Sequence, residues 1–305
     1  MVEHKSKALM CGKGGRMQRR TSKSGGTVFA LAGGGNLGAV QVGMLRALLE
    51  GGIRPDAVVG TSIGALNGVY LAGHADLDGI AELNDLWLSV HRRDVFPLSM
   101  WGLARGIFGQ RSFLFAPRGL GALVTRAKLG YENLEDFPIP VSVVATDLAD
   151  AEAVELSVGP AIEALLASAA IPGVFPPVEI DGRLLVDGGV LADVPIVQAD
   201  ALGAARIFVL PTTPANAPMH PVSAVLMMQR ALSIAARGSA RRAFDAVSSK
   251  TPVYVMPVPM VAGHLSIFDF RQTRRLIDEA YQMSAAWLAE VGREEAIAGS
   301  QVAVA

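Results

Sequence analysis

The sequence predicts an α/β protein in which helices cover both faces of an open, mostly parallel sheet, a three-layer α/β/α arrangement. Three observations support this fold class. The chain has 305 residues, of which 51% are hydrophobic, so it can bury a large core. Two strand–loop–helix units follow each other near its start, and short apolar runs alternate with helical patterns further on. Because parallel strands need a crossover connection, usually a helix, this alternation favours a parallel sheet.

The first two units contain the clearest elements. In each, an apolar strand leads through a glycine-containing turn into a helix with apolar residues at helical spacing. The strands are expected at 28–32 and 57–59, and the helices at 37–50 and 65–72. Later strands are expected at 141–146, 184–186, 206–210 and 252–256, and later helices at 78–90, 161–170, 222–237 and 273–291. No repeat or linker interrupts 27–291, so a single domain is expected there.

Both ends of the chain differ from this domain. Residues 1–26 contain seven lysines and arginines against one acidic residue, Glu3, and lack the apolar stretch of a secretory signal. We expect 1–26 to be a disordered basic tail, either simply solvated or attracted to anionic lipid headgroups. Residues 292–305 are expected to be a flexible C-terminal tail.

Composition excludes several classes of function. Cys11 is the single cysteine, so an intrachain disulfide and a cysteine zinc site are excluded, and a cytoplasmic location fits. The five histidines lack metal-ligand spacing, and we expect neither a metal nor another cofactor. The formal net charge is −1, and no nucleic acid partner is expected. The sequence contains no run of about 18 consecutive apolar residues, so no membrane span is expected.

A glycine-rich loop follows the first strand. The stretch "ALAGGGNLGAV" contains G-x-G-x-x-G at Gly33, Gly35 and Gly38, a pattern found in dinucleotide-binding loops. That function also needs an acidic residue at the end of the second strand to bind the ribose. Asp56 lies before that strand, at the wrong end of the sheet. A nucleotide site is therefore poorly supported.

The second strand leads instead into G-x-S-x-G, from Gly60 to Gly64, with Ser62 at its centre. This motif between a strand and a helix is typical of a nucleophile elbow, where flanking glycines allow a sharp turn. The alternative is an ordinary turn in which Ser62 caps the helix. If Ser62 attacks an acyl carbonyl, the amides of Gly33, Gly34 and Gly35 lie at the same sheet edge and could bind the oxyanion.

A serine nucleophile needs a base. One candidate is Asp187, which ends an apolar run and precedes Gly188 and Gly189; its alternative role is a hairpin turn, since Asp-Gly favours turns. The other candidate is a triad of Ser62, Asp147 or Asp187, and His264. These residues have the chain order of an α/β-hydrolase, but in that fold the serine follows later strands.

Four blocks follow one another along the chain. They are Gly33-Gly-Gly-Asn-Leu-Gly38, Gly60-Thr-Ser-Ile-Gly-Ala-Leu-Asn67, Ser168-Ala-Ala-Ile-Pro-Gly-Val-Phe-Pro-Pro177 and Asp187-Gly-Gly-Val-Leu-Ala-Asp-Val-Pro195. In this order, they resemble the signature blocks of bacterial patatin-like phospholipases. The resemblance covers about 27–291 and implies a patatin-like three-layer fold, with Ser62 as nucleophile and Asp187 as base without a histidine. It also implies an oxyanion hole at Gly33 to Gly38 and metal-independent hydrolysis of lipid acyl esters.

Two residues depart from this family pattern. Leu37 stands where many members have a cation, and Asp193 where many have asparagine. The missing cation supports an alternative function, a catalytically impaired lipid-binding or regulatory protein.

The expected partner is a lipid ester, with peripheral membrane contact. The segment 98–115 mixes Trp101, Phe108, Phe113 and Phe115 with arginines, which suits a membrane interface, a lid or packing on the core. The helix at 222–237 contains Met227 and Met228, which suit either the core or an acyl-chain groove. Neither segment identifies the lipid class or the oligomeric state.

Overall fold

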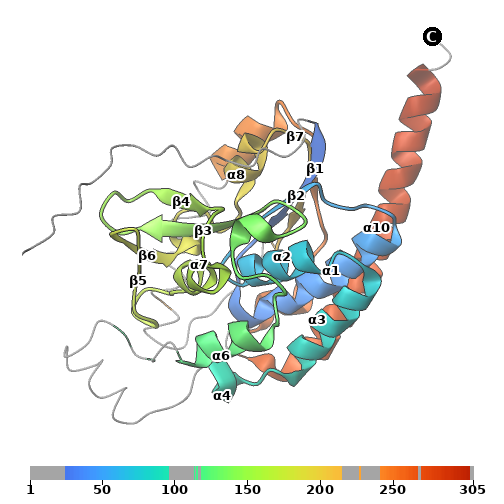
Figure 1. Cartoon of the computed structure of the whole chain (residues 1–305). Helices are drawn as coiled ribbons and strands as arrows, with labels where there is room; N and C mark the ends of the chain where they lie inside the picture. Colours follow the sequence, from blue (N-terminus) through green and yellow to red (C-terminus); the bar gives the residue numbers. More distant parts are fainter. Residues whose placement is uncertain are drawn as a thin grey trace, which may run out of the picture.

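The computed structural model describes residues 25–95, 113, 115, 118–214, 227, 241–266 and 269–302. Its centre is an eight-stranded sheet with the strand order β5-β6-β3-β2-β1-β7-β8, and β4 pairs with β3 outside this path. Helices lie on both sides of the sheet (Figure 1). The strands are β1 Gly26–Leu31, β2 Ala57–Thr61, β3 Val141–Asp147, β4 Ala153–Leu156, β5 Val178–Ile180, β6 Arg183–Asp187, β7 Ala204–Leu210 and β8 Val253–Val255.

The predicted fold class is confirmed, because β1, β2, β3, β7 and β8 pair in parallel while β4, β5 and β6 pair antiparallel. Short 3-10 helices are η1 Gly35–Gly38, η2 Leu134–Asp136, η3 Gly188–Val190, η4 Met260–His264 and η5 Phe270–Gln272. The α-helices are α1 Ala39–Glu50, α2 Ile63–Gly73, α3 Leu77–Ser89, α4 Arg92–Val95, α6 Arg118–Arg126, α7 Ala161–Ser168, α8 Ile196–Ala201 and α10 Thr273–Val302.

Alternate residues of the central strands enter two separate cores. In β1, Phe29 and Leu31 pack beneath α1, α2 and α10, whereas Val28 and Ala30 face α8 and the helical residues 241–248. This period of two follows from the strand geometry. Because both faces are covered, these strands have apolar residues on both faces, as the sequence suggested.

The pairing of β3 brings the ends of β2 and β6 together. Thr61 of β2 pairs with Val144, and Asp187 of β6 pairs with Ala145, the next residue of β3. β4 pairs with β3 over 143–146, so it occupies the opposite edge. β2 and β6 therefore follow each other along one edge of β3. Since they run in opposite directions, their carboxyl ends meet.

Some predictions were incomplete. The short elements β4, β5, α6 and α8 were not expected, and the helix expected from residue 37 begins as the 3-10 turn η1. Residues 292–302, expected to belong to a flexible C-terminal tail, continue α10, which runs to Val302 and extends away from the body (Figure 1). Arginine, glutamate and alanine between 293 and 298 are strong helix formers, which explains the continuation.

Three predicted segments fall largely outside the described residues: the basic tail at 1–26, the aromatic segment at 98–115 and the helix at 222–237. Phe113 and Phe115 are described, and Phe115 packs against the main core. Among the described helices, none is both long enough and apolar enough to cross a membrane.

Candidate active site

Ser62 lies on a strained turn between β2 and α2. Its φ of 54° and ψ of −123° are unfavourable for a residue with a side chain. The flanking glycines permit this turn, because a Cβ on Gly60 would lie 2.5 Å from Gly64 O and a Cβ on Gly64 would collide with the backbone of Leu31. The Ser62 side chain makes no capping hydrogen bond to α2. Ser62 therefore occupies the N-cap position of α2, but its hydroxyl does not cap the helix.

The Ser62 hydroxyl is bound to Asp187 instead. Ser62 Oγ donates to Asp187 Oδ2 at 2.7 Å, and Asp187 Oδ1 accepts from the Gly189 amide at 2.7 Å. Both side chains are buried, with residue exposures of 8% and 6%. These hydrogen bonds fix the Asp187 carboxylate at the end of β6, with Oδ2 facing Ser62 and Oδ1 facing Gly189.

The hairpin alternative for Asp187 is wrong. The β5–β6 hairpin turns at Asp181 and Gly182, both with positive φ. Asp187 leads instead into η3, and a Cβ on Gly188 would collide with the Val144 carbonyl. The two glycines after Asp187 thus allow its backbone to lie close against β3.

Burial raises the pKa of Asp187 from 3.8 to about 7. Loss of solvation is the largest cause, because the charged carboxylate is disfavoured away from water. The hydrogen bonds from Gly189 and Ser62 oppose this rise, and the nearby charge of Asp193 adds to it. A carboxyl group with a pKa near neutrality can accept and return a proton at physiological pH.

Ser168 holds the elbow from the other side. The Ser62 amide donates to Ser168 Oγ at 2.7 Å, and that hydroxyl donates to Val144 O at 2.6 Å. Ser168 ends α7 and is fully buried. Ser168 begins the third of the four sequence blocks, but the sequence alone did not indicate a function for it. Its contact with Ser62 depends on packing between residues 106 positions apart.

The glycine loop faces Ser62 from the end of β1. Gly34 and Gly35 have φ values of 152° and 59°, which favour glycine. A Cβ on Gly34 would collide with Thr212, whose hydroxyl donates to Gly33 O. Gly34 is the N-cap of η1 and Gly35 is its first residue, so neither amide has an acceptor within that helix.

Gly33 and Gly38, which were also expected in the oxyanion hole, make other contacts. The Gly33 amide donates to Asp193 O at 3.0 Å, so the predicted donor at Gly33 is already engaged. Gly38 packs closely on α2 and α3, since a Cβ there would lie 2.7 Å from Ile63 and 3.2 Å from Trp87. Leu37, at the position of the absent cation, is buried in the main core.

A buried polar network supports the loop from beneath. Gln41 Nε2 donates to Ala32 O at 2.8 Å, before the glycines, and Asn67 Nδ2 donates to Gly38 O at 3.0 Å, after them. Asn67 Nδ2 also donates to Gln41 Oε1, and Trp87 Nε1 donates to Asn67 Oδ1. Because these bonds lie away from water, they fix both ends of the loop.

An apolar pocket opens at Ser62. Its empty volume, including the open mouth, is about 590 Å³. Side chains from α2, α3, α4, α6 and the segment after α7 form most of its wall. The lining residues are Gly35, Asn36, Ser62, Ile63, Leu66, Leu86, Trp87, Val90, Val95, Leu120, Leu123, Ala169, Ile171, Phe175 and Phe270.

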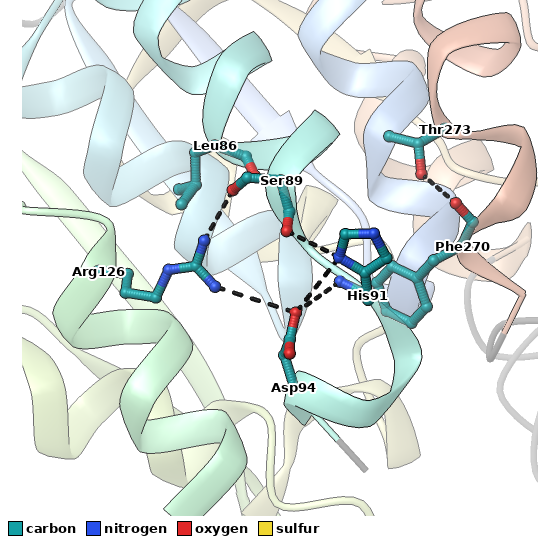
Figure 2. Close-up of polar contacts among 7 residues, drawn as sticks. All are labelled: Leu86, Ser89, His91, Asp94, Arg126, Phe270 and Thr273. Atoms are coloured by element: carbon teal, nitrogen blue, oxygen red, sulfur yellow. Dashed lines mark hydrogen bonds and ion pairs between the residues drawn. The ribbon is translucent and has the colours of Figure 1, made fainter. Parts of the chain in front are cut away.

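Polar contacts join the helices behind this wall. Figure 2 shows Arg126 of α6 reaching Ser89 and Asp94, while Asp94 accepts from the His91 amide. The Arg126 Nη2 to Ser89 Oγ distance is 2.8 Å. These groups are exposed, so each contact contributes little stability. They nevertheless link the end of α3, which carries Leu86, to α4 and α6.

The described residues give little support to Asp147 or His264 as part of a catalytic triad, or to a nucleotide-binding site at the glycine loop. Asp147 Oδ1 accepts from the amides of Ala149 and Asp150 in its own turn. The His264 backbone is in η4, and its side chain lies outside the described residues. Asp56 accepts from the Thr27 amide at the start of β1, at the opposite end of the strands from the glycine loop.

Comparisons with known proteins identify the family of the chain. The chain is 32% identical over 261 residues to an uncharacterized NTE family protein of Mycobacterium tuberculosis, covering 85% of this chain and 62% of that relative. It is also 32% identical over 197 residues to a lysophospholipase of Neurospora crassa, covering 63% of this chain and 12% of that protein.

Among solved structures, VipD from Legionella pneumophila aligns with a TM-score of 0.46 at 15% identity, covering 88% of this chain and 67% of that chain. The family model of the patatin-like phospholipases matches residues 29–200. This match contains the glycine loop, the strained serine turn and the aspartate that binds the serine. The chain therefore belongs to the patatin-like phospholipase family.

Proposed function

We propose that the protein is a serine acyl hydrolase that cleaves ester bonds of lipids. The observation that carries this proposal is the 2.7 Å hydrogen bond from Ser62 Oγ to Asp187 Oδ2. Ser62 lies on a strained turn and lines an apolar pocket. The serine supplies the nucleophile, and the buried carboxylate supplies a base with a pKa of about 7.

In the proposed reaction, Asp187 takes the hydroxyl proton as Ser62 Oγ attacks the ester carbonyl. The amides of Gly34 and Gly35 and the N-terminus of α2 stabilise the negative charge on the carbonyl oxygen. Asp187 then returns the proton to the leaving alcohol, and an acyl-enzyme forms. In the second half, Asp187 takes a proton from water as the water oxygen attacks the acyl-enzyme carbonyl. When the bond from that carbonyl carbon to Ser62 Oγ breaks, Asp187 returns the proton to Ser62 Oγ and the fatty acid is released.

The pocket supports an acyl-chain substrate. Its lining is almost entirely apolar, so it favours an aliphatic chain over a charged or sugar group. The Neurospora crassa relative is named a lysophospholipase, which is consistent with a lipid ester as substrate. We further propose that the protein contacts membranes peripherally, because such substrates reside there.

The proposal is tested by measuring hydrolysis of a nitrophenyl ester by the Ser62→Ala and Asp187→Asn variants. Both should lose activity while circular dichroism shows an unchanged fold. Ser142→Ala is the matched control, since Ser142 is a buried serine that donates to Glu155 on β4, and it should remain active. Full activity of Ser62→Ala would contradict the proposal.

A fluorophosphonate probe distinguishes the catalytically impaired alternative. An active enzyme should be labelled at Ser62, and Ser62→Ala should not be labelled. Liposome binding without any labelling of the wild type would favour a lipid-binding function. The burial of Leu37 in the core gives no support to that alternative.

A further inference from the structure

Asn36 is a polar residue in an otherwise apolar pocket. It lies in η1 between Gly35 and Leu37, is 1% exposed and lines the pocket beside Ser62. Trp87 also lines this pocket, but its indole N–H is bound to Asn67. Among the described lining residues, Ser62 and Asn36 are therefore the side chains that offer polar groups to a ligand.

The orientation of the Asn36 carboxamide is fixed by its one hydrogen bond. Asn36 Nδ2 donates to the backbone carbonyl of Asp269, and a carbonyl can only accept, so the nitrogen must face it. The oxygen then faces the other way. Within the described part of the chain, Asn36 Oδ1 is buried and accepts no hydrogen bond.

An unpaired buried acceptor is unfavourable. Leaving one without a partner costs about 1–3 kcal/mol, and most buried polar atoms in proteins are paired. Asn67, beneath the same loop, uses its oxygen and its amide nitrogen in three hydrogen bonds. Packing alone would favour an apolar side chain at 36, so the free oxygen suggests a ligand that donates a hydrogen bond.

We propose that Asn36 Oδ1 accepts a hydrogen bond from a substrate hydroxyl close to the scissile ester, and that it selects hydroxylated over unsubstituted esters. This inference rests on the proposed function. Asn36 follows Gly35, a proposed oxyanion donor, so its side chain begins one residue from the carbonyl site. Because Asn36 lines the acyl pocket, the hydroxyl belongs near the carboxyl end of the acyl chain. A hydroxyl on the alcohol half would supply the same chemistry.

Two pairs of substrates test this inference in the wild-type protein. Nitrophenyl 3-hydroxydecanoate is compared with nitrophenyl decanoate, and glycerol monodecanoate with propyl decanoate. We expect kcat/KM to be about 10-fold higher for the hydroxylated member of one pair, the gain typical of one added hydrogen bond to a buried acceptor. Preference in the first pair places the hydroxyl on the acyl chain, and preference in the second places it on the alcohol.

The variant Asn36→Leu should reduce this preference to a ratio of about one, since it removes the acceptor while retaining similar volume. Asn36→Ala serves the same purpose if the leucine variant does not fold. Thr212→Val is the matched control, because it removes a hydrogen bond to the same loop at Gly33 and leaves Asn36 in place. It should alter both members of a pair equally.

Three results would overturn the inference: equal kcat/KM within both pairs for the wild type, a preference retained in a folded Asn36→Leu or Asn36→Ala variant, or loss of the preference in Thr212→Val as well. Each of these results leaves the proposed function standing if the wild type hydrolyses the unsubstituted esters and Ser62→Ala does not. The two proposals therefore fail separately.

Discussion

Replacing Asp187 by asparagine should inactivate the protein and also stabilise it, by an amount that depends on pH. The asparagine oxygen can still accept from Gly189, and its amide group can still bind Ser62 Oγ. What is removed is a buried negative charge, which is also repelled by Asp193. The activity falls because a neutral amide cannot take the serine proton.

The size of the stabilisation follows from the pKa. A rise from 3.8 to about 7, at about 1.36 kcal/mol per pKa unit, corresponds to about 4 kcal/mol of folding free energy. Below about pH 4 the Asp187 carboxyl group is protonated in both the folded and the unfolded chain, so its raised pKa does not lower the free energy of unfolding. Stability is lost as the pH rises from there, and the loss is complete above about pH 7, where both forms are ionised.

Urea unfolding of both proteins at pH 5 and pH 8 measures this effect. The advantage of Asp187→Asn should grow by about 2–3 kcal/mol between these pH values. In the wild type, kcat/KM should fall below an apparent pKa of about 7, because only the carboxylate acts as a base. A constant stability difference, or an activity limb at the ordinary carboxyl pKa, would refute this reasoning.

Three further substitutions test separate parts of the site. Gly34→Ala keeps the backbone N–H, but its Cβ would collide with the Thr212 side chain at a φ of 152°. The loop must therefore shift and misplace its oxyanion donor, which should lower kcat by about 100-fold. Gly121→Ala, with open space at its Cβ, should not lower kcat, and equal activities of the two variants would contradict the role of the loop. Ser168→Ala leaves the buried Ser62 amide unpaired and should destabilise the protein by about 1–3 kcal/mol in urea unfolding, and an unchanged midpoint would count against it. Leu123→Trp narrows the pocket and should lower kcat/KM for long-chain esters more than for a butyrate ester; an unchanged chain-length profile would show that the acyl chain binds elsewhere.

The sequence was sufficient for the local features of the site. The turn at Ser62 requires glycines on both sides, and the glycine loop requires positive φ at Gly34 and Gly35. Such backbone conformations depend on a few neighbouring residues, so a sequence motif can indicate them directly. The parallel part of the sheet was predictable for a similar reason, because apolar strands alternating with helices have few other arrangements.

The short and irregular elements were less predictable. The hairpin of β5 and β6 turns at Asp181 and Gly182, yet the sequence favoured a turn at Asp187 equally, since both positions are Asp-Gly. The tertiary structure separates them, because only at Asp187 does the chain lie against β3. Local propensity does not contain this information.

The sequence by itself determined which residues can do the chemistry, and only the tertiary structure decided which of them meet. Ser62 and Asp187 are 125 positions apart, and they touch because β2 and β6 share one edge of β3. The same packing binds the Gly33 amide to Asp193 O and leaves the Asn36 oxygen in the pocket without a hydrogen-bond partner among the described residues. Hydrogen-bond partners of this kind are set by strands and loops distant in the chain, so no local pattern specifies them.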